Sequence, residues 1–420
     1  MKAKEHGRRR FLKESVALAG LAVGAIRSAS AQTLAPETPA APPKDFRAYG
    51  ERSRFVDSVR TFKDGGGPTP HHPHGFLTPI QDSVGIITPS SLHFWEDHGY
   101  NLPEIEPRQH RLMIHGMVDR RLIFTLEELQ RLPSVSRIHF IECNANSRPR
   151  RGPDAESIQI VHGMTSCSEW TGVLLSLLLQ EAGVQTGARW ILAEGAEAGK
   201  YTKSHPLEKA LEDVLVAYGQ NGEAVRPDQG YPLRLLVPGW QGINNVKWLR
   251  RIKVVDQPYM GKRESTDYAE LRPDGKAVWF QVELGPYSVI TRPSGGQRLP
   301  GRGFYEITGL AWSGGGAIRR LEVSTDGGRT WKDAELQGPV HPKAHTRFRF
   351  PWNWNGEETL LRSRSTDERG QVQPTVAELA KIWGFPADYY QSVTFLTGNF
   401  NAIQTWKITR DGSVQNAMFS

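Results

Sequence analysis

The chain has 420 residues, a formal net charge of +7 at pH 7 and only two cysteines. Its first 31 residues hold seven basic and two acidic side chains, so the rest of the chain carries only +2, and the charge does not indicate a nucleic-acid partner. Two cysteines exclude a disulfide scaffold, and without a Cys-x-x-Cys-His motif the chain binds no c-type haem of its own.

The N-terminus has the pattern of an export signal. Arg8-Arg9-Arg10-Phe11-Leu12-Lys13 fits the twin-arginine motif, and Ser28-Ala29-Ser30-Ala31 ends in an Ala-x-Ala cleavage pattern. The apolar stretch between them is shorter than the roughly 18–20 residues that span a bilayer. Residues 1–31 are therefore predicted to be a twin-arginine signal peptide, which makes the protein periplasmic and leaves no membrane span. That export route commonly carries proteins already folded around a cofactor.

The chain beyond the signal is expected to form an arm and two domains, because about 390 residues are more than one core usually serves. Residues 32–76 are rich in proline, alanine and charge and are predicted to be an extended N-terminal arm. The arm contains His71-His72-Pro73-His74, which could bind a metal. A solvated loop is favoured there, because the proline restricts ligand geometry.

Residues 77–261 mix strand and helix patterns without regular strand–helix–strand repeats, which indicates an α+β domain. A helix is expected to begin at Thr125, with Glu128 completing a capping box. Another is expected to open at Ser168, run to Leu179 and end near Gly183. A hairpin turn is predicted at residues 221–222, where the sequence is Asn-Gly, and strands are predicted over residues 111–118, 233–237 and 248–255.

Residues 262–420 have few helical signals and many short apolar runs separated by glycine and proline turns. Ile318 to Ser324 alternates between apolar and polar residues, turns at Asp326-Gly327-Gly328 and resumes at Trp331. This spacing is typical of an antiparallel β-sandwich. Its tryptophans are expected in the core and at an interface rather than in catalysis; they are Trp312, Trp331, Trp352 and Trp354.

Cys143 is the residue that points most directly to chemistry. A strand-like run from Ser136 to Glu142 leads into a polar, cationic turn, and the thiol lies at the junction. A single soft ligand in an exported protein suggests a redox metal enzyme. The residues alone leave two alternatives open, an inert buried cysteine and a disulfide with Cys167.

Long motifs along the chain make it similar to the sulfite oxidase family of molybdenum enzymes. The resemblance runs from about Leu77 through the predicted sandwich, and within the family it is strongest to the molybdenum subunits of bacterial sulfane dehydrogenases. The segments that carry it are 87–94 (Ile-Thr-Pro-Ser-Ser-Leu-His-Phe), 168–172 (Ser-Glu-Trp-Thr-Gly), 206–210 (Pro-Leu-Glu-Lys-Ala) and 401–404 (Asn-Ala-Ile-Gln). The resemblance implies an α+β molybdopterin-binding domain over residues 77–261 and an immunoglobulin-like dimerisation domain over residues 262–420.

The resemblance also implies a site for one molybdenum–molybdopterin cofactor. Cys143 is implied as the thiolate ligand of molybdenum, with Arg148 and Arg150 depressing its pKa. Tyr268 and Arg148 are implied to line the substrate pocket and bind an oxyanion. The implied cofactor-binding residues are His98, Arg234, Lys247, Glu197 and Asn146.

Two departures from the family pattern bear on the substrate. Glu96 stands where the family often has an arginine that helps to bind the oxyanion, and the usual Cys-Ala-Gly-Asn is here Cys-Asn-Ala-Asn over residues 143–146. A carboxylate in place of a guanidinium repels a sulfite dianion. We therefore expect oxidation of sulfane sulfur presented by a carrier protein, or of sulfite, with electrons passed to a separate c-type cytochrome. A free-sulfite dehydrogenase, a sulfoxide reductase and a non-catalytic scaffold are the alternatives.

Overall fold

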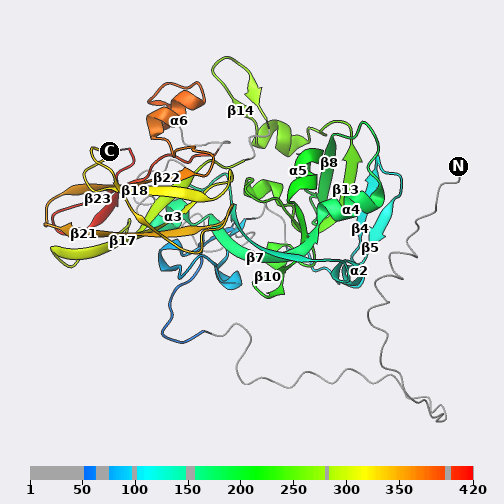
Figure 1. Ribbon diagram of the computed structural model, residues 1–420, viewed down its shortest axis with the longest axis horizontal. Coiled ribbons are helices and arrows are strands. Elements are labelled where there is room, and N and C mark those ends of the chain that lie inside the picture. Colours follow the sequence, from blue (N-terminus) through cyan, green and yellow to red (C-terminus); the bar gives the residue numbers. More distant parts are fainter. Residues whose placement is uncertain are drawn as a thin grey trace, which may run out of the picture. The chain divides into compact units, whose positions relative to one another are not determined.

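The computed structural model of the chain describes residues 52–62, 75–96, 102–147, 157–279, 283–392 and 399–419 (Figure 1). Of Arg263, Asp267 and Glu270 it describes only the backbone. The predicted signal peptide, most of the predicted arm and the loop of residues 71–74 lie outside the described residues. Residues 54–420 belong to one unit, which is the part of the chain considered below.

The predicted α+β region contains three sheets. A small antiparallel sheet has the order β1-β2-β3, and a second antiparallel sheet has the order β11-β10-β7-β6, with β12 also paired to β10. The third has the order β5-β4-β13-β8-β9 and is mixed, because β13 runs parallel to β4 and antiparallel to β8. The strands are β1 (Thr61–Phe62), β2 (Gly75–Leu77), β3 (Trp95–Glu96), β4 (Leu112–Gly116), β5 (Leu122–Phe124), β6 (Val135–Glu142), β7 (Thr165–Leu174), β8 (Trp190–Gly195), β9 (Thr202–Pro206), β10 (Leu215–Gln220), β11 (Glu223–Ala224), β12 (Arg234–Leu236) and β13 (Leu249–Val255).

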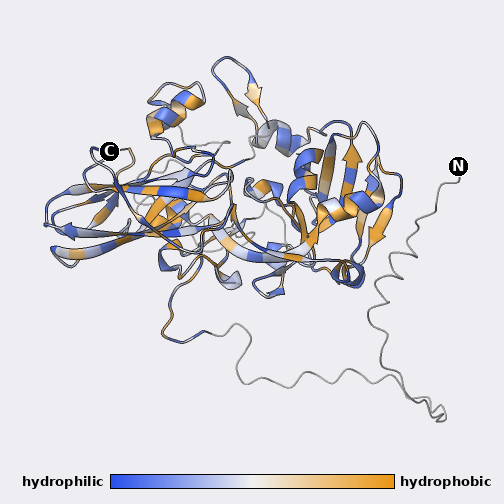
Figure 2. Ribbon diagram, in the orientation of Figure 1, coloured by the Kyte–Doolittle hydropathy of each residue, from blue (hydrophilic) through white to orange (hydrophobic). Residues whose placement is uncertain are grey.

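The helices of this region are short. They are α2 (Leu126–Gln130), α3 (Ile158–His162), α4 (Leu175–Ala182) and α5 (Leu207–Glu212), with 3-10 turns η1 (Ile80–Asp82), η2 (Ser90–Leu92), η4 (Pro227–Gln229) and η5 (Gly242–Asn244). Nowhere in the described ranges is a helix both long and apolar enough to cross a membrane. Leucines of α4 pack against the mixed sheet, and the ends of β5 and β13 in that sheet are hydrophobic (Figure 2).

Most of the predicted local structure is confirmed. Thr125 caps α2, its side chain accepting from the Glu128 backbone while the Glu128 side chain accepts from the Thr125 backbone, which is the expected capping box. Asn221 and Gly222 join β10 to β11 with φ angles of 52° and 76°, the left-handed conformation that such a hairpin needs. The three predicted strands are β4, β12 and β13.

The helix predicted to open at Ser168 is wrong. Residues Thr165–Leu174 form strand β7, which is hydrogen-bonded on one side to β6 and on the other to β10. The helix α4 begins only at Leu175, although it ends as expected, with Gly183 left-handed at φ 73°. Pairing with two neighbouring strands outweighed the local helical pattern, as is common for segments in the middle of a sheet.

The C-terminal region is an antiparallel sandwich, as predicted. One sheet has the order β16-β17-β21-β20 and the other β19-β18-β22-β23-β24, with the hairpin β14-β15 before them. The strands are β14 (Glu270–Leu271), β15 (Ala277–Val278), β16 (Tyr287–Arg292), β17 (Gly303–Trp312), β18 (Ile318–Ser324), β19 (Lys332–Asp333), β20 (Glu335–Gln337), β21 (Thr346–Trp354), β22 (Thr359–Asp367), β23 (Thr405–Ile408) and β24 (Val414–Asn416). The helical segments here are η6 (Arg263–Asp267), α6 (Val376–Ile382) and α7 (Tyr389–Ser392).

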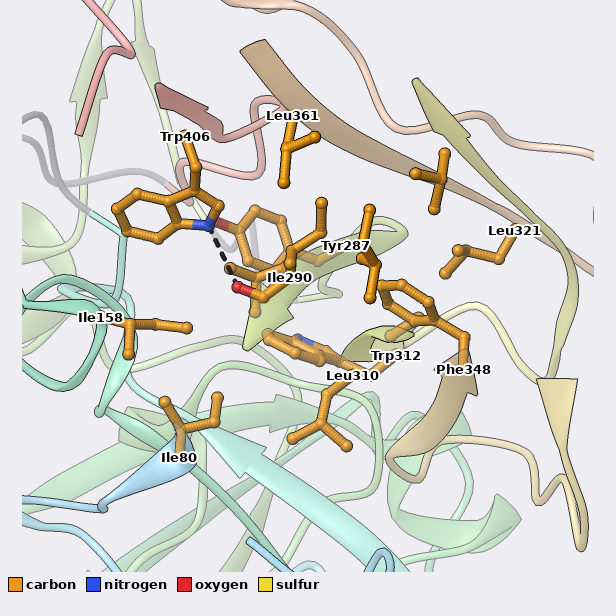
Figure 3. Packing of buried hydrophobic residues seen from close by; sticks show 14 of the residues in the cluster. Ile80, Ile158, Tyr287, Ile290, Leu310, Trp312, Leu321, Phe348, Leu361 and Trp406 are labelled. Atoms are coloured by element: carbon orange, nitrogen blue, oxygen red, sulfur yellow. Dashed lines mark hydrogen bonds between the residues drawn. The ribbon is translucent and has the colours of Figure 1, made fainter. Parts of the chain in front are cut away.

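The core of the sandwich continues into the preceding region. Its large buried side chains include Trp312, Phe348 and Trp406. The indole N–H of Trp406 donates to the carbonyl of Ile290 at 3.0 Å (Figure 3). The same cluster also contains side chains that precede the sandwich in sequence: Ile80, Phe140, Ile158 and Cys167. The two regions therefore share buried apolar surface, which couples the position of β6 to that of the sandwich.

Buried histidines predict loss of stability in acid. Burial lowers the pKa of His162, His205 and His345 to about 3 from the ordinary 6.5. The unfolded chain therefore binds more protons than the folded chain between pH 6.5 and 3. The stability present above pH 6.5 is lost as the pH falls through this range. The loss in the free energy of unfolding is about 1.4 kcal/mol per pH unit for each histidine. Glu142, whose pKa burial raises to about 7, has the opposite slope between pH 4.5 and 7. It is one group against five, because burial also lowers the pKa of His93 to about 3 and that of His139 to about 4.

The check is urea denaturation of the purified protein at pH 7, 6 and 5. The free energy of unfolding should fall steadily across this series. In a His345→Gln variant the slope should decrease by about one proton, or about 1.4 kcal/mol per pH unit. A free energy of unfolding that stays constant from pH 7 to pH 5 would show that these imidazoles are not held neutral by the fold.

Candidate active site

Cys143 lies in a tight turn that follows the last residue of β6. Its backbone N–H donates to the carbonyl of Met164 at 3.0 Å, and the N–H of Asn146 donates to the Cys143 carbonyl at 2.9 Å. The thiol is partly exposed and lies 3.6 Å from Oδ1 of Asn144. No disulfide joins it to Cys167, which is buried and whose pKa burial raises to about 12, so that second thiol stays protonated.

The side chain of Asn146 holds this turn together. Its Nδ2 donates to Oε1 of Glu142 at 2.8 Å, and its Oδ1 accepts from the Met164 backbone at 3.0 Å. The other oxygen of Glu142 accepts from the indole N–H of Trp312 at 2.7 Å. Asn146 was predicted to bind a cofactor; the contacts seen here give it a role in fixing the turn, and its contact with a cofactor stays a prediction.

Arg234 on β12 is a buried cation. Its Nη1 donates to the carbonyl of Gln229 at 2.9 Å and its Nη2 to the carbonyl of Asn245 at 3.4 Å, and the guanidinium lies 4.8 Å from the ring centre of Trp170. Burial lowers its pKa to about 9. Among the described residues no carboxylate lies within salt-bridge distance of it, and its Nε has no hydrogen-bond partner. A surface cation is therefore excluded, and the buried charge calls for an anion.

Lys247 and Glu197 lie close to each other near this cation. The Lys247 ammonium donates to the carbonyls of Glu96 at 2.9 Å and Asp228 at 3.2 Å. A Cβ added to Gly195 would lie 2.1 Å from Oε2 of Glu197 and 2.8 Å from the Lys247 carbonyl, so the glycine makes room for both. Burial raises the pKa of Glu197, whose Oε1 accepts from the Tyr201 backbone, while Oε2 has no hydrogen-bond partner among the described residues.

His93 is a neighbour of Arg234 that sequence reasoning did not single out. It is 1% exposed, its ring packs edge-on against Trp170, and its Nδ1 contacts the Phe94 carbonyl at 2.9 Å. Its Nε2 is buried without a partner in the described part of the chain, and burial lowers its pKa to about 3. The available signal was its place inside the motif of residues 87–94, which was used only for the resemblance.

Tyr268 follows η6 and lies beside β9. The ammonium of Lys203, a buried residue on β9, is 5.4 Å from the Tyr268 ring centre. The next residues of β9 link this region to the cysteine turn, because His205 Nε2 contacts the Asn244 carbonyl at 3.0 Å in η5. A Cβ on Gly242, the first residue of η5, would lie 3.0 Å from the carbonyl of Glu142. Tyr268 is thus connected to the cysteine turn through β9 and η5.

The structure brings Cys143, Asn146 and Arg234 to the same apolar cluster or the turn beside it. Cys143 packs against the apolar cluster that contains Trp170, and Arg234 lies over the same indole ring. His98, Arg148 and Arg150 lie outside the described residues, so their predicted roles stay predictions. The order β6-β7-β10-β12 places the end of β6 and Arg234 in one sheet, which local sequence patterns do not determine.

The residues present fit an anionic pterin cofactor with a metal. Buried polar atoms without partners among the described residues accumulate here: Arg234 Nε, Glu197 Oε2, His93 Nε2, His205 Nδ1 and Asn244 Oδ1. Buried donors and acceptors are nearly always satisfied in folded proteins, so these atoms indicate a polar ligand. A phosphate would satisfy the guanidinium, and a soft metal would suit the Cys143 thiolate.

Comparison with known proteins identifies the same kind of ligand. Residues 98–263 match the model of the oxidoreductase molybdopterin binding domain, and residues 278–395 match that of the Mo-co oxidoreductase dimerisation domain. The solved structure of the sulfane dehydrogenase SoxCD from Paracoccus pantotrophus is similar, with a TM-score of 0.81 and 38% identity over 92% of this chain and 96% of that chain.

Curated relatives include plant and algal nitrate reductases that use NADH. The Volvox carteri enzyme is 32% identical over 70% of this chain and 38% of its own length, and one from Arabidopsis thaliana is 34% identical over 68% of this chain and 35% of its own length. The chain therefore spans well under half the length of these relatives.

Proposed function

Because the chain belongs to the sulfite oxidase family of molybdenum enzymes, we propose that it is a sulfane or sulfite dehydrogenase that passes electrons to a c-type cytochrome in thiosulfate oxidation. The observation that carries the proposal is the buried Arg234, a cation with no carboxylate within salt-bridge distance in the described structure, in the same sheet as the Cys143 turn. The 38% identity with a sulfane dehydrogenase over almost the whole of both chains favours sulfur over nitrate as the substrate class.

The proposal assigns a role to each site residue. When bound, a molybdenum–molybdopterin cofactor supplies oxygen-atom transfer and two-electron redox chemistry. The Cys143 thiolate ligates the metal, and Arg234 and Lys247 neutralise the phosphate of the pterin. Glu197 accepts hydrogen bonds from the pterin, and the Tyr268 phenol hydrogen-bonds an oxygen of the substrate. Arg148 and His98 complete the pocket and the cofactor contacts.

The experiment that tests the function is a comparison of three substrates. The full-length molybdenum-replete protein is assayed with its cytochrome against free sulfite, against carrier protein bearing sulfane sulfur, and against nitrate with a reduced electron donor. We expect turnover of the carrier-bound sulfane and slower turnover of sulfite. Turnover of nitrate alone, or of none of the three by a protein that holds molybdenum, contradicts the proposal.

Glu96 is expected to set the preference between the two sulfur substrates. The side-chain carboxylate of Glu96 lies next to Gly75, and its backbone carbonyl accepts a hydrogen bond from Lys247. Glu96 therefore lies beside one of the proposed cofactor-binding residues. Glu96→Arg removes a repulsion and adds an attraction, each about 1 kcal/mol or more, so the KM for sulfite should fall roughly tenfold or further. The carrier-bound substrate should gain less, because the carrier contributes binding energy of its own. An unchanged sulfite KM in a molybdenum-replete variant would show that Glu96 does not face the substrate.

The proposed location is the periplasm, reached through the twin-arginine route. Replacing Arg8 and Arg9 together with Lys should leave unprocessed precursor in the cytoplasm, because that route reads the arginine pair itself. Immunoblots of periplasmic and cytoplasmic fractions provide the measurement. Normal periplasmic processing of the double variant would exclude this route.

The proposed assembly is a homodimer that also binds the cytochrome subunit. The match of residues 278–395 to a dimerisation domain supports the first interface, and the similar solved structure is that of the SoxCD enzyme.

A further inference from the structure

The turn that carries Cys143 is tied to the sandwich by a buried carboxylate. Glu142 is 2% exposed, and the two oxygens of its side chain face different regions of the chain. One accepts from Asn146 Nδ2 at 2.8 Å within the turn, and the other accepts from Trp312 Nε1 at 2.7 Å at the end of β17. No cation lies within salt-bridge distance of it in the described structure, so these neutral donors fix its position.

A second link leaves the same turn at Ser147, four residues after Cys143. Ser147, fully buried with φ 60°, is 2.8 Å from Nδ1 of His162, and the Tyr287 hydroxyl is 3.1 Å from that same nitrogen. His162 Nε2 lies 3.2 Å from the carbonyl oxygen of the Gln404 side chain, which can only accept. The imidazole therefore carries its proton on Nε2, and the single lone pair of Nδ1 accepts a hydrogen bond from one of these two hydroxyls. Tyr287 and Gln404 belong to the C-terminal region, so both ends of the turn are held from there.

We propose that Glu142 and Trp312 are positioning residues that aim the Cys143 thiol at the cofactor, so that the sandwich forms part of the active site. This inference rests on the proposed function, in which Cys143 ligates molybdenum. Attachment of the turn to the rigid sandwich matters because a metal ligand must be held within a fraction of an ångström of its productive geometry. Without the indole N–H, the Glu142 carboxylate loses its link to β17 and the turn gains freedom to move.

The test compares two tryptophan variants of the full-length, molybdenum-replete protein. Trp312→Phe removes the N–H that reaches Glu142. Trp354→Phe is the matched control, since that indole is also buried in the sandwich core and donates at 2.8 Å, but to the carbonyl of Glu357 and not to the cysteine turn. The readouts are the rate at which iodoacetamide alkylates Cys143, followed by peptide mass spectrometry, together with molybdenum content, kcat and KM.

We expect alkylation of Cys143 to be at least about tenfold faster in Trp312→Phe than in the unmodified protein, with kcat lowered about tenfold and KM nearly unchanged. Trp354→Phe should match the unmodified protein. Glu142→Gln provides a second variant, because its amide NH₂ faces a donor where the carboxylate accepted. It should show the same changes that are expected of Trp312→Phe, so the test stands even if Trp312→Phe does not fold.

The possible failures are distinguishable. If Cys143 is alkylated as fast in the molybdenum-replete unmodified protein as in the cofactor-free protein, the thiol is not a ligand and the inference falls together with the proposed ligand role. If Cys143 is protected in the unmodified protein and equally protected in Trp312→Phe and Glu142→Gln, the positioning role alone is wrong. Equal effects of Trp312→Phe and Trp354→Phe would show a general loosening of the sandwich and would also overturn it.

Discussion

Replacing Cys143 with Ser is expected to abolish activity, with a decrease of at least about a thousandfold. The serine hydroxyl is a hard, neutral donor at pH 7, whereas molybdenum in this family is held by soft sulfur, so the variant loses the protein ligand and the redox properties that depend on it. The turn should still form, because its bonds through Asn146 and Met164 do not involve the thiol. Metal mass spectrometry and cytochrome-linked turnover measure the effect.

Cys167→Ser is the matched control for this prediction. That residue is fully buried on β7, and its thiol stays protonated, so no chemical role is expected for it. Turnover and molybdenum content should remain close to normal, while a hydroxyl in an apolar cluster costs roughly 1–3 kcal/mol of stability. Full activity in Cys143→Ser would exclude the ligand role, and loss of activity in both variants would point to a defect in folding.

Replacing Arg234 with Met is expected to weaken cofactor retention about 10- to 100-fold, which corresponds to the loss of one charge-assisted hydrogen bond to a phosphate. The cofactor-free protein should be no less stable, and more stable by up to about 3 kcal/mol, because the variant removes a buried cation that has no carboxylate within salt-bridge distance in the described structure. If Arg234 served stability alone, its replacement would not weaken cofactor retention while the free energy of unfolding of the cofactor-free protein stayed the same or rose.

Arg364→Met in the sandwich is the control, and its effects should have the reverse pattern. Arg364 on β22 makes an ion pair with the buried Glu322 at 2.8 Å. Its loss leaves a carboxylate without that partner, so the free energy of unfolding should fall while cofactor retention stays unchanged. Cofactor content after dialysis and urea denaturation of the cofactor-free proteins are the two measurements. Unchanged cofactor retention in Arg234→Met would remove this residue from the proposed site.

Local sequence determined the elements whose stabilising contacts are close in the chain. The capping box of Thr125 and Glu128 spans three residues, and the hairpin at Asn221 and Gly222 depends on two left-handed positions, so both were predicted correctly. Short contiguous motifs likewise pointed to the family and to Cys143 as the proposed ligand, because each motif is read from neighbouring residues.

Only the tertiary structure decided the features that depend on distant partners. The local pattern predicted a helix at the residues that form strand β7. The partners that make it a strand, β6 and β10, include residues up to about fifty positions away, so a local pattern does not show them. The absence of a carboxylate within salt-bridge distance of Arg234 in the described residues became visible only once β12 was placed in its sheet. The bond between Glu142 and Trp312 joins residues 170 positions apart, and no spacing rule relates them. Hydrogen bonding and burial act through space, so the sequence pointed to the residue that is proposed to carry the chemistry, and the fold determined what holds it in place.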